Sequence, residues 1–129
     1  MELVVKNLDR PDDRREFPKG VGELAQVGEF SVSRGTLQPG WRWSNDIRPM
    51  MGTPSCEVPH TGVTLSGRWH FEMDDGASVD LGPGDAFSIP PGHDAWVVGD
   101  EPVVVLDWAT AANEARTDMI EKSSHSVDR

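Results

Sequence analysis

The sequence predicts an all-β domain whose antiparallel strands form a sandwich or barrel, and three observations support this. The 129 residues include 13 glycines and 10 prolines, which favour tight turns and interrupt helices. Turn sequences recur at short intervals from about residue 28 onward. Several of the short runs between these turns alternate apolar and polar residues, as half-buried strands do. These observations argue against a helical bundle.

The alternation is clearest at residues 69–73. There Trp69, Phe71 and Met73 share one face of the predicted strand, and polar side chains occupy the other face. Residues 103–106 are instead a continuous apolar run. Such a run indicates a strand that is buried on both faces or that lies in the core of a sandwich.

The remaining segments have their own signals. Asp75-Gly76 predicts a β-hairpin with a type I′ turn, because both central residues of that turn need a positive φ. Residues 1–27 are highly charged at their centre and read as an N-terminal arm or edge strand. Residues 45–59 contain too many prolines for a central strand and predict a loop over one end of the domain. Residues 110–123 contain helix formers and predict a short terminal helix.

Composition excludes several classes of function. The formal net charge of −10 disfavours binding to the phosphates of nucleic acids. No run of apolar residues is long enough for a transmembrane helix, so no membrane partner is expected. The first residues also lack the apolar core of a signal peptide. With a single cysteine and therefore no internal disulfide, the expected location is the cytoplasm.

Residues 84–96 resemble the second conserved motif of the cupin superfamily, since Gly84, Pro90 and Gly92 fall at that motif's spacing. Upstream, residues 63–68 resemble the end of the first cupin motif, where a strand turns at a glycine. The resemblance implies that residues 28–108 form a small antiparallel cupin barrel, also called a double-stranded β-helix or jelly roll. Residues 109–129 would be a tail. Because small cupins commonly dimerise, a homodimer is also expected.

The resemblance also implies a metal site inside the barrel. His60 occupies the place of a motif glutamate or histidine, and Cys56 the place of a motif histidine. Two departures accompany these matches, because Pro54 and Ala95 stand where the family has ligating histidines. His93 lies two residues before Ala95 and would share its face of the strand. The expected ligands are therefore His60, His93 and Cys56.

Two histidines and a thiolate suit a divalent transition metal, and the sequence does not distinguish Zn, Fe, Mn, Ni or Cu. The leading hypothesis is a small metallo-cupin that acts on a small organic molecule, as a dioxygenase, isomerase or lyase if it is an enzyme. The alternative is a metal-free cupin that binds or senses a small molecule. A purely structural protein is the third hypothesis. Asp94 and Glu57 are candidates to orient a ligating imidazole.

Tryptophan is unusually frequent, with five copies and no tyrosine. Trp41 and Trp43 would share one strand face, and Trp96 follows His93. One interpretation is that these three side chains line a substrate pocket in the barrel mouth. The other is ordinary core packing. His70 lies opposite Trp69 in the alternation and is expected to point outward.

Overall fold

Antiparallel strands joined by tight turns make up most of residues 2–110, the part of the chain that the computed structural model describes. In chain order the elements are β1 (Asp13–Phe17), β2 (Gly20–Val27), β3 (Phe30–Leu37), α1 (Trp43–Asp46), α2 (Arg48–Met51), β4 (His60–Ser66), β5 (Arg68–Met73), β6 (Ser78–Leu81), β7 (Ala86–Ile89), β8 (His93–Val98) and β9 (Val103–Thr110). The predicted all-β class is confirmed. None of the helices in this part of the chain could cross a membrane.

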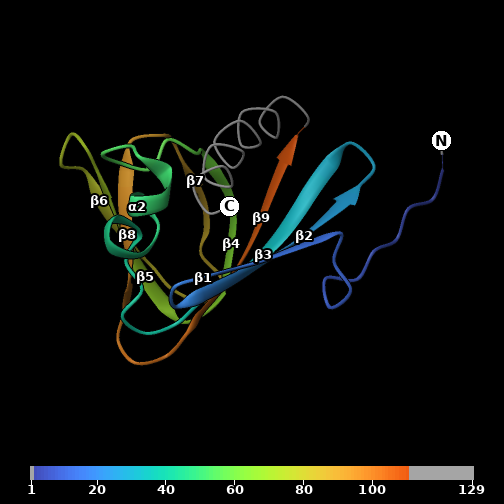
Figure 1. Cartoon of the computed structure of the whole chain (residues 1–129), viewed down its shortest axis with the longest axis horizontal. Coiled ribbons are helices and arrows are strands. Elements are labelled where there is room, and N and C mark those ends of the chain that lie inside the picture. Colours follow the sequence, from blue (N-terminus) through green and yellow to red (C-terminus); the bar gives the residue numbers. More distant parts are fainter. Residues whose placement is uncertain (1, 111–129) are drawn as a thin grey trace.

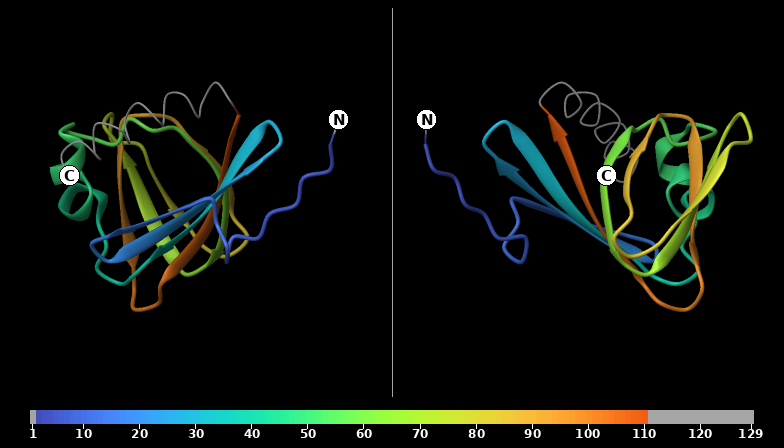
Figure 2. Two further views of the ribbon diagram at one scale, coloured as in Figure 1. Left: turned by 45° about the vertical axis from the view of Figure 1, so that its right-hand side comes forward. Right: turned by 180° about the vertical axis from the view of Figure 1, so that it is seen from behind.

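The strands form two sheets. One has the order β1-β2-β3-β9-β4-β7 and the other β6-β5-β8, and every pairing is antiparallel. The two sheets curve around a common interior, and the β2–β3 hairpin with the end of β9 projects beyond it (Figure 1 and Figure 2). Part of residues 1–27, which were expected to be an N-terminal arm or edge strand, forms β1 and β2. These two strands extend one edge of the larger sheet.

The core follows the alternation of the strands. Phe71 and Val103, which face the interior, are 2% and 0% exposed. Aromatic rings pack edge to face within this core, with the Trp69 and Phe71 centroids 4.5 Å apart at 68° and those of Trp69 and Phe87 5.8 Å apart at 81°. Such contacts add to the stabilisation from apolar burial. The side chains that pack together are Leu37, Trp41, Trp43, Cys56, Trp69, Phe71, Leu81, Phe87, Ile89, Ala95, Val97, Val103 and Val105.

The hairpin predicted at Asp75-Gly76 is present between β5 and β6, but its predicted turn type is wrong. Gly76 has φ of 93°, whereas Asp75 is not among the residues with positive φ. The Gly76 N–H donates to the Met73 carbonyl, and the Met73 N–H donates to the Ala77 carbonyl. This is the longer hairpin in which a tight turn is followed by one left-handed glycine. Only one residue therefore needs a positive φ.

Two short helices replace the loop predicted for residues 45–59. The absence of a strand was predicted correctly, but α1 and α2 were not. Pro49 lies in the first turn of α2, where a missing N–H costs no helical hydrogen bond. Gly52 ends that helix with φ of 75°. The terminal helix predicted at 110–123 falls, apart from Thr110 in β9, outside the described residues.

Replacing Thr64 with valine is expected to lower the free energy of unfolding by about 1–3 kcal/mol. Thr64 is 0% exposed, and its hydroxyl accepts a hydrogen bond of 3.0 Å from the Trp69 indole N–H. Valine keeps the shape but leaves that buried donor without a partner. Urea unfolding followed by fluorescence measures the change. Thr61→Val, at an exposed position of the same strand, is the control, and an equal loss in both variants would contradict the argument.

Candidate metal centre

Cys56 is fixed to His93 by the backbone. The Cys56 N–H donates to the His93 carbonyl at 2.7 Å, and the Gly92 N–H donates to the Cys56 carbonyl at 2.7 Å. This bridge ties the segment after α2 to the first residue of β8. Both side chains are buried, with 4% of Cys56 and 2% of His93 exposed. The backbone therefore places a thiol beside an imidazole before any ion binds.

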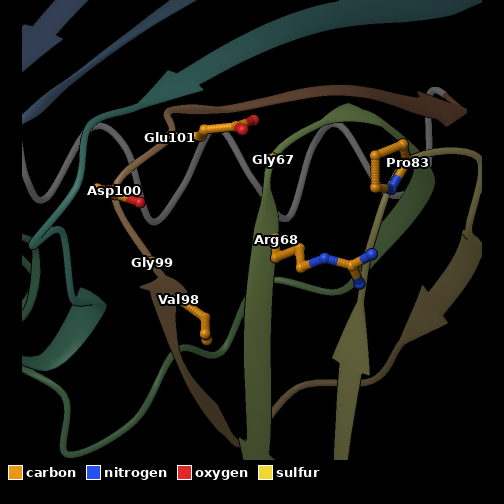
Figure 3. Close-up of a pocket in the computed structure, with 7 residues that line it drawn as sticks. All are labelled: Gly67, Arg68, Pro83, Val98, Gly99, Asp100 and Glu101. Carbon is orange, nitrogen blue, oxygen red and sulfur yellow. The ribbon is translucent and has the colours of Figure 1, made fainter.

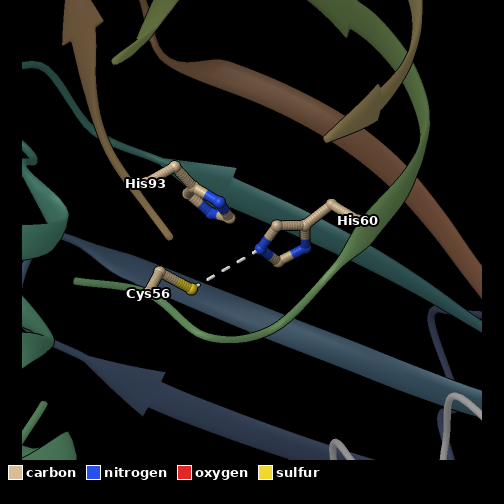
Figure 4. Close-up of side chains that lie close together, drawn as sticks. All are labelled: Cys56, His60 and His93. Carbon is tan, nitrogen blue, oxygen red and sulfur yellow. Dashed lines mark hydrogen bonds between the residues drawn. The ribbon is translucent and has the colours of Figure 1, made fainter. Parts of the chain in front are cut away.

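His60 completes the group from the first position of β4. Its Nε2 atom lies 3.8 Å from the Cys56 Sγ atom, and its ring centroid lies 5.1 Å from that of His93. The possible ligand atoms of Cys56, His60 and His93 all lie within 4.8 Å of one another. Figure 4 shows the three side chains pointing toward one another from three different segments. The structure thus brings together all three residues that the sequence suggested as ligands.

Hydrogen bonds orient both imidazoles. The His93 Nδ1 atom lies 2.9 Å from the Pro90 carbonyl oxygen, which only accepts, so Nδ1 carries a proton. The His60 Nδ1 atom lies 3.1 Å from a carboxylate oxygen of Asp107 and donates to it. Each ring can then present Nε2 to a metal ion, and a partner at Nδ1 is the usual support for a ligating histidine.

The sequence analysis missed Asp107 and suggested other residues for this role. Asp94 instead accepts hydrogen bonds from the Ser44 N–H at 3.0 Å and from Arg42 at 3.3 Å. Glu57 accepts a hydrogen bond from the Ser55 hydroxyl, at 3.3 Å. A signal for Asp107 was present, because it continues the inward alternation of Val103 and Val105. A carboxylate at an inward strand position requires a partner.

The thiol and His60 perturb one another's pKa. Burial would raise the pKa of Cys56, but hydrogen bonds and positive charge from His60 and His93 outweigh burial and lower it. Burial would lower the pKa of His60, but the Asp107 carboxylate and the Cys56 thiolate raise it. Both shifts favour a thiolate on Cys56 beside a protonated His60. A bound cation would displace the proton at Nε2.

A cavity of about 510 Å³ opens beside this group. Trp41 and Trp43 line it, as the sequence suggested, together with all three candidate ligands. Both tryptophans also belong to the core, being 6% and 5% exposed. They therefore pack in the core and line the cavity at the same time. This volume accommodates a small organic molecule.

Trp96 does not line the cavity, so its predicted place in the pocket is wrong. Along β8, His93, Ala95 and Val97 are buried, and the intervening residues face the other side. The Trp96 ring packs there against His70, at 4.6 Å between centroids, and beneath the Arg42 guanidinium at 4.2 Å. His70 points outward as expected and pairs with Asp80 at 2.6 Å.

A second cavity of about 330 Å³ lies away from the candidate metal centre and is lined by Gly67, Arg68, Pro83, Val98, Gly99, Asp100 and Glu101 (Figure 3). Its lining includes none of the three candidate ligands. One cation and two carboxylates contribute its charge. We therefore place the chemistry in the larger cavity.

No protein-family model matches the sequence, and neither does any curated protein sequence. Solved structures do match. A cupin-2 domain from Rhodospirillum rubrum superposes with a TM-score of 0.55 at 20% identity, over 84% of this chain and 68% of that one. A cupin-like protein from Thermotoga maritima gives 0.52 at 18% identity, over 73% and 71% of the two chains. The chain has the cupin fold.

The cupin resemblance seen in the sequence is thereby confirmed at the level of fold. Another match is the polyketide cyclase RemF from Streptomyces resistomycificus, with a TM-score of 0.53 at 20% identity over 73% of this chain and 66% of that one. In this cupin fold, Gly84 at the start of the second motif and Gly92 within it take φ of 87° and 92°. The bend at Gly92 directs His93 into the barrel.

Proposed function

We propose that this cupin binds a divalent transition metal through Cys56, His60 and His93 and acts on a small organic molecule in the 510 Å³ cavity. The convergence of three ligand atoms within 4.8 Å of one another is the observation that carries the proposal. A tetrahedral Zn²⁺ ion would separate a sulfur ligand from a nitrogen ligand by about 3.6 Å. The 3.8 Å between Cys56 Sγ and His60 Nε2 is close to that value.

The donor set favours some metals over others. A thiolate and two imidazoles suit Zn²⁺, Fe²⁺ or copper, whereas Mg²⁺ and Ca²⁺ prefer oxygen ligands. With three ligands from the chain, a metal keeps a position for water or substrate and supplies Lewis acidity at that position. The chain itself orients the imidazoles through Asp107 and the Pro90 carbonyl. Trp41 and Trp43 surround the bound molecule with apolar surface.

Elemental analysis of the full chain, purified without a histidine tag, tests the proposal. We expect close to one transition-metal ion per chain, or stoichiometric binding when the metal is added back to EDTA-treated protein. The metal proposal is wrong if no metal co-purifies and no added metal binds with a dissociation constant below about 1 μM. A dissociation constant of about 1 μM would be weak for a site of this kind. The metal-free binding module would then be the better description.

A second candidate function rests on the line of side chains from Asp107 through His60 to Cys56. A carboxylate, an imidazole and a thiol in this order activate cysteine nucleophiles. The thiolate would attack an ester carbonyl, release the alcohol and form a thioester that water hydrolyses. Turnover of p-nitrophenyl acetate by EDTA-treated protein, lost in Cys56→Ser and inhibited by added Zn²⁺, would favour this candidate. No turnover would exclude it for activated esters.

Replacing Asp107 with alanine is expected to weaken metal binding by about 10–100-fold. The substitution removes the acceptor for the His60 Nδ1 proton, so the ring loses its fixed orientation. Competition with a chelator measures the affinity, and the visible spectrum of the Co²⁺ form reports the ligand geometry. Asp107→Asn restores an acceptor oxygen and is expected to recover part of the affinity. An unchanged Co²⁺ spectrum and affinity in Asp107→Ala would contradict the role given to this carboxylate.

A further inference from the structure

An apolar segment leaves the body of the molecule without joining either sheet. In residues 2–6, which we call the leading segment, Leu3 and Val5 are 100% and 90% exposed. As alternate residues of an extended chain they share one face. The leading segment makes no backbone-to-backbone hydrogen bond within residues 2–110. Its apolar and β-branched residues are typical of a strand and not of a solvated tail. Leu3 and Val5 therefore present an apolar surface that the described part of the chain leaves open.

Ion pairs and a backbone hydrogen bond hold the base of the leading segment on the larger sheet. Lys6 Nζ lies 2.8 Å from an Asp12 carboxylate oxygen, and an Asp9 oxygen lies 2.7 Å from the Arg34 guanidinium of β3. The Asp12 N–H also donates to the Leu24 carbonyl of β2 at 2.9 Å. From this base the segment runs away from the sheets in Figure 1 and in both views of Figure 2. It therefore reaches outward, where a second molecule can contact it.

A second open apolar surface lies on the projecting part of the larger sheet. Val27 pairs in register with Phe30, and Val32 pairs with Trp108. Because Phe30 and Val32 are two residues apart on β3, these four side chains share one face of the sheet, which we call the outer patch. Phe30 is 44% exposed and Trp108 is 40% exposed. Of the four, only Trp108 also borders the cavity.

The two surfaces account for most of the apolar exposure of the molecule. Eight large hydrophobic side chains of residues 2–110 are exposed, and five of them are Leu3, Val4, Val5, Phe30 and Trp108. Such a concentration on a protein surface marks an interaction site. The strands of the outer patch project from the barrel on the same side as the leading segment (Figure 1).

A second copy of the chain supplies what each surface lacks. The leading segment is an apolar strand without a sheet, and the outer patch is an apolar sheet face without a cover. Another partner would have to bring both a matching face and a matching strand, whereas a second copy already carries both. A two-fold axis lets the same contact form twice and closes the assembly.

We infer that two copies of this chain exchange their leading segments, so that Leu3 and Val5 of each copy pack on the outer patch of the other. The contact is apolar, and the charge of the two chains opposes it, because each has a formal net charge of −10. This association goes beyond the proposed function and needs no metal. EDTA treatment should therefore leave the dimer intact.

Sedimentation of the full chain at about 100 μM tests the association. We expect a species of twice the chain mass of 14.2 kDa. Added NaCl is expected to strengthen the dimer, because it screens the repulsion between the two acidic chains. A protein that sediments only as a monomer, or a dimer that NaCl dissociates, would overturn the inference.

Matched substitutions locate the contact. Leu3→Asp combined with Val5→Asp, the segment variant, is expected to raise the dissociation constant at least about a hundredfold, because each buried side chain is lost twice per dimer. Phe30→Asp, the patch variant, is expected to act in the same direction. Val79→Asp is the control, since Val79 is 42% exposed on β6 of the other sheet, and it should leave the dimer unchanged. Thermal melting verifies that each variant is folded. An unaltered dimer in the folded segment or patch variant, or an equal loss in Val79→Asp, would overturn the assignment.

Mixing the segment variant with the patch variant distinguishes exchange from packing within one chain. In the mixed dimer one contact joins an intact segment to an intact patch, whereas neither variant alone retains such a contact. We therefore expect the mixture to associate more tightly than either variant by itself. No gain on mixing would overturn the exchange, because a segment that packs on its own chain cannot be rescued by a second chain.

Discussion

Replacing His60 with alanine is expected to lower the affinity for the transition metal by about a hundredfold or more. Structural zinc sites with four ligands bind with about 10–16 kcal/mol, so each ligand supplies about 3 kcal/mol, which corresponds to about a hundredfold. Asp107 supports the candidate site through its hydrogen bond with His60. Loss of His60 therefore removes both a ligand and the carboxylate support. Competition with a chelator of known affinity measures the change.

His70→Ala is the matched control for that substitution. His70 is also a strand histidine paired with an aspartate, at 2.6 Å from Asp80, but it lies on the outer side of β5 against Trp96. Metal affinity should be unchanged in this variant. Equal losses in His60→Ala and His70→Ala would mean that the measurement reports general destabilisation and not loss of a ligand.

Replacing Gly67 with alanine is expected to lower the free energy of unfolding by at least about 3 kcal/mol. Gly67 joins β4 to β5 with φ of 79°. A Cβ atom here would overlap the Pro102 carbonyl oxygen and lie 2.7 Å from the Val103 Cα atom. Both of these atoms belong to backbone and cannot rotate away. Urea unfolding followed by fluorescence measures the effect.

Gly76→Ala separates steric overlap from backbone strain. Gly76 has φ of 93° but a Cβ atom there would meet no heavy atom within 4 Å. Strain alone should then lower the free energy of unfolding by about 1 kcal/mol. If Gly67→Ala were no more destabilised than Gly76→Ala, the close approach of residues 67 and 102 would not determine stability.

Much of the fold could be predicted because its signals are local. Turn glycines and alternating strands can be read within a few residues, and the spacing of Gly84, Pro90 and Gly92 identifies one cupin motif. The short helices were not predictable in this way. α1 and α2 contain four residues each, so neither has a full amphipathic repeat that a sequence pattern could reveal.

The site was predicted in part, and the errors have one cause. His60 and Cys56 were recognised by their positions in the first motif, and His93 because it shares a strand face with the motif position occupied by Ala95. Strand parity should have excluded Trp96, because residues 93, 95 and 97 face inward. The same parity should have included Asp107 after Val103 and Val105. Counting alternation from a known inward residue resolves both errors without a structure.

The backbone bridge between Cys56 and His93 has a consequence for the order of folding and metal binding. Ordering a free segment of chain costs about 1–2 kcal/mol per residue. In small zinc domains this cost is met by the metal, so that they unfold without it. Here hydrogen bonds of 2.7 Å already order both residues, and the core lies in the strands around them. Folding is therefore expected to need no metal, and the proposed ion would bind at a site that is already assembled.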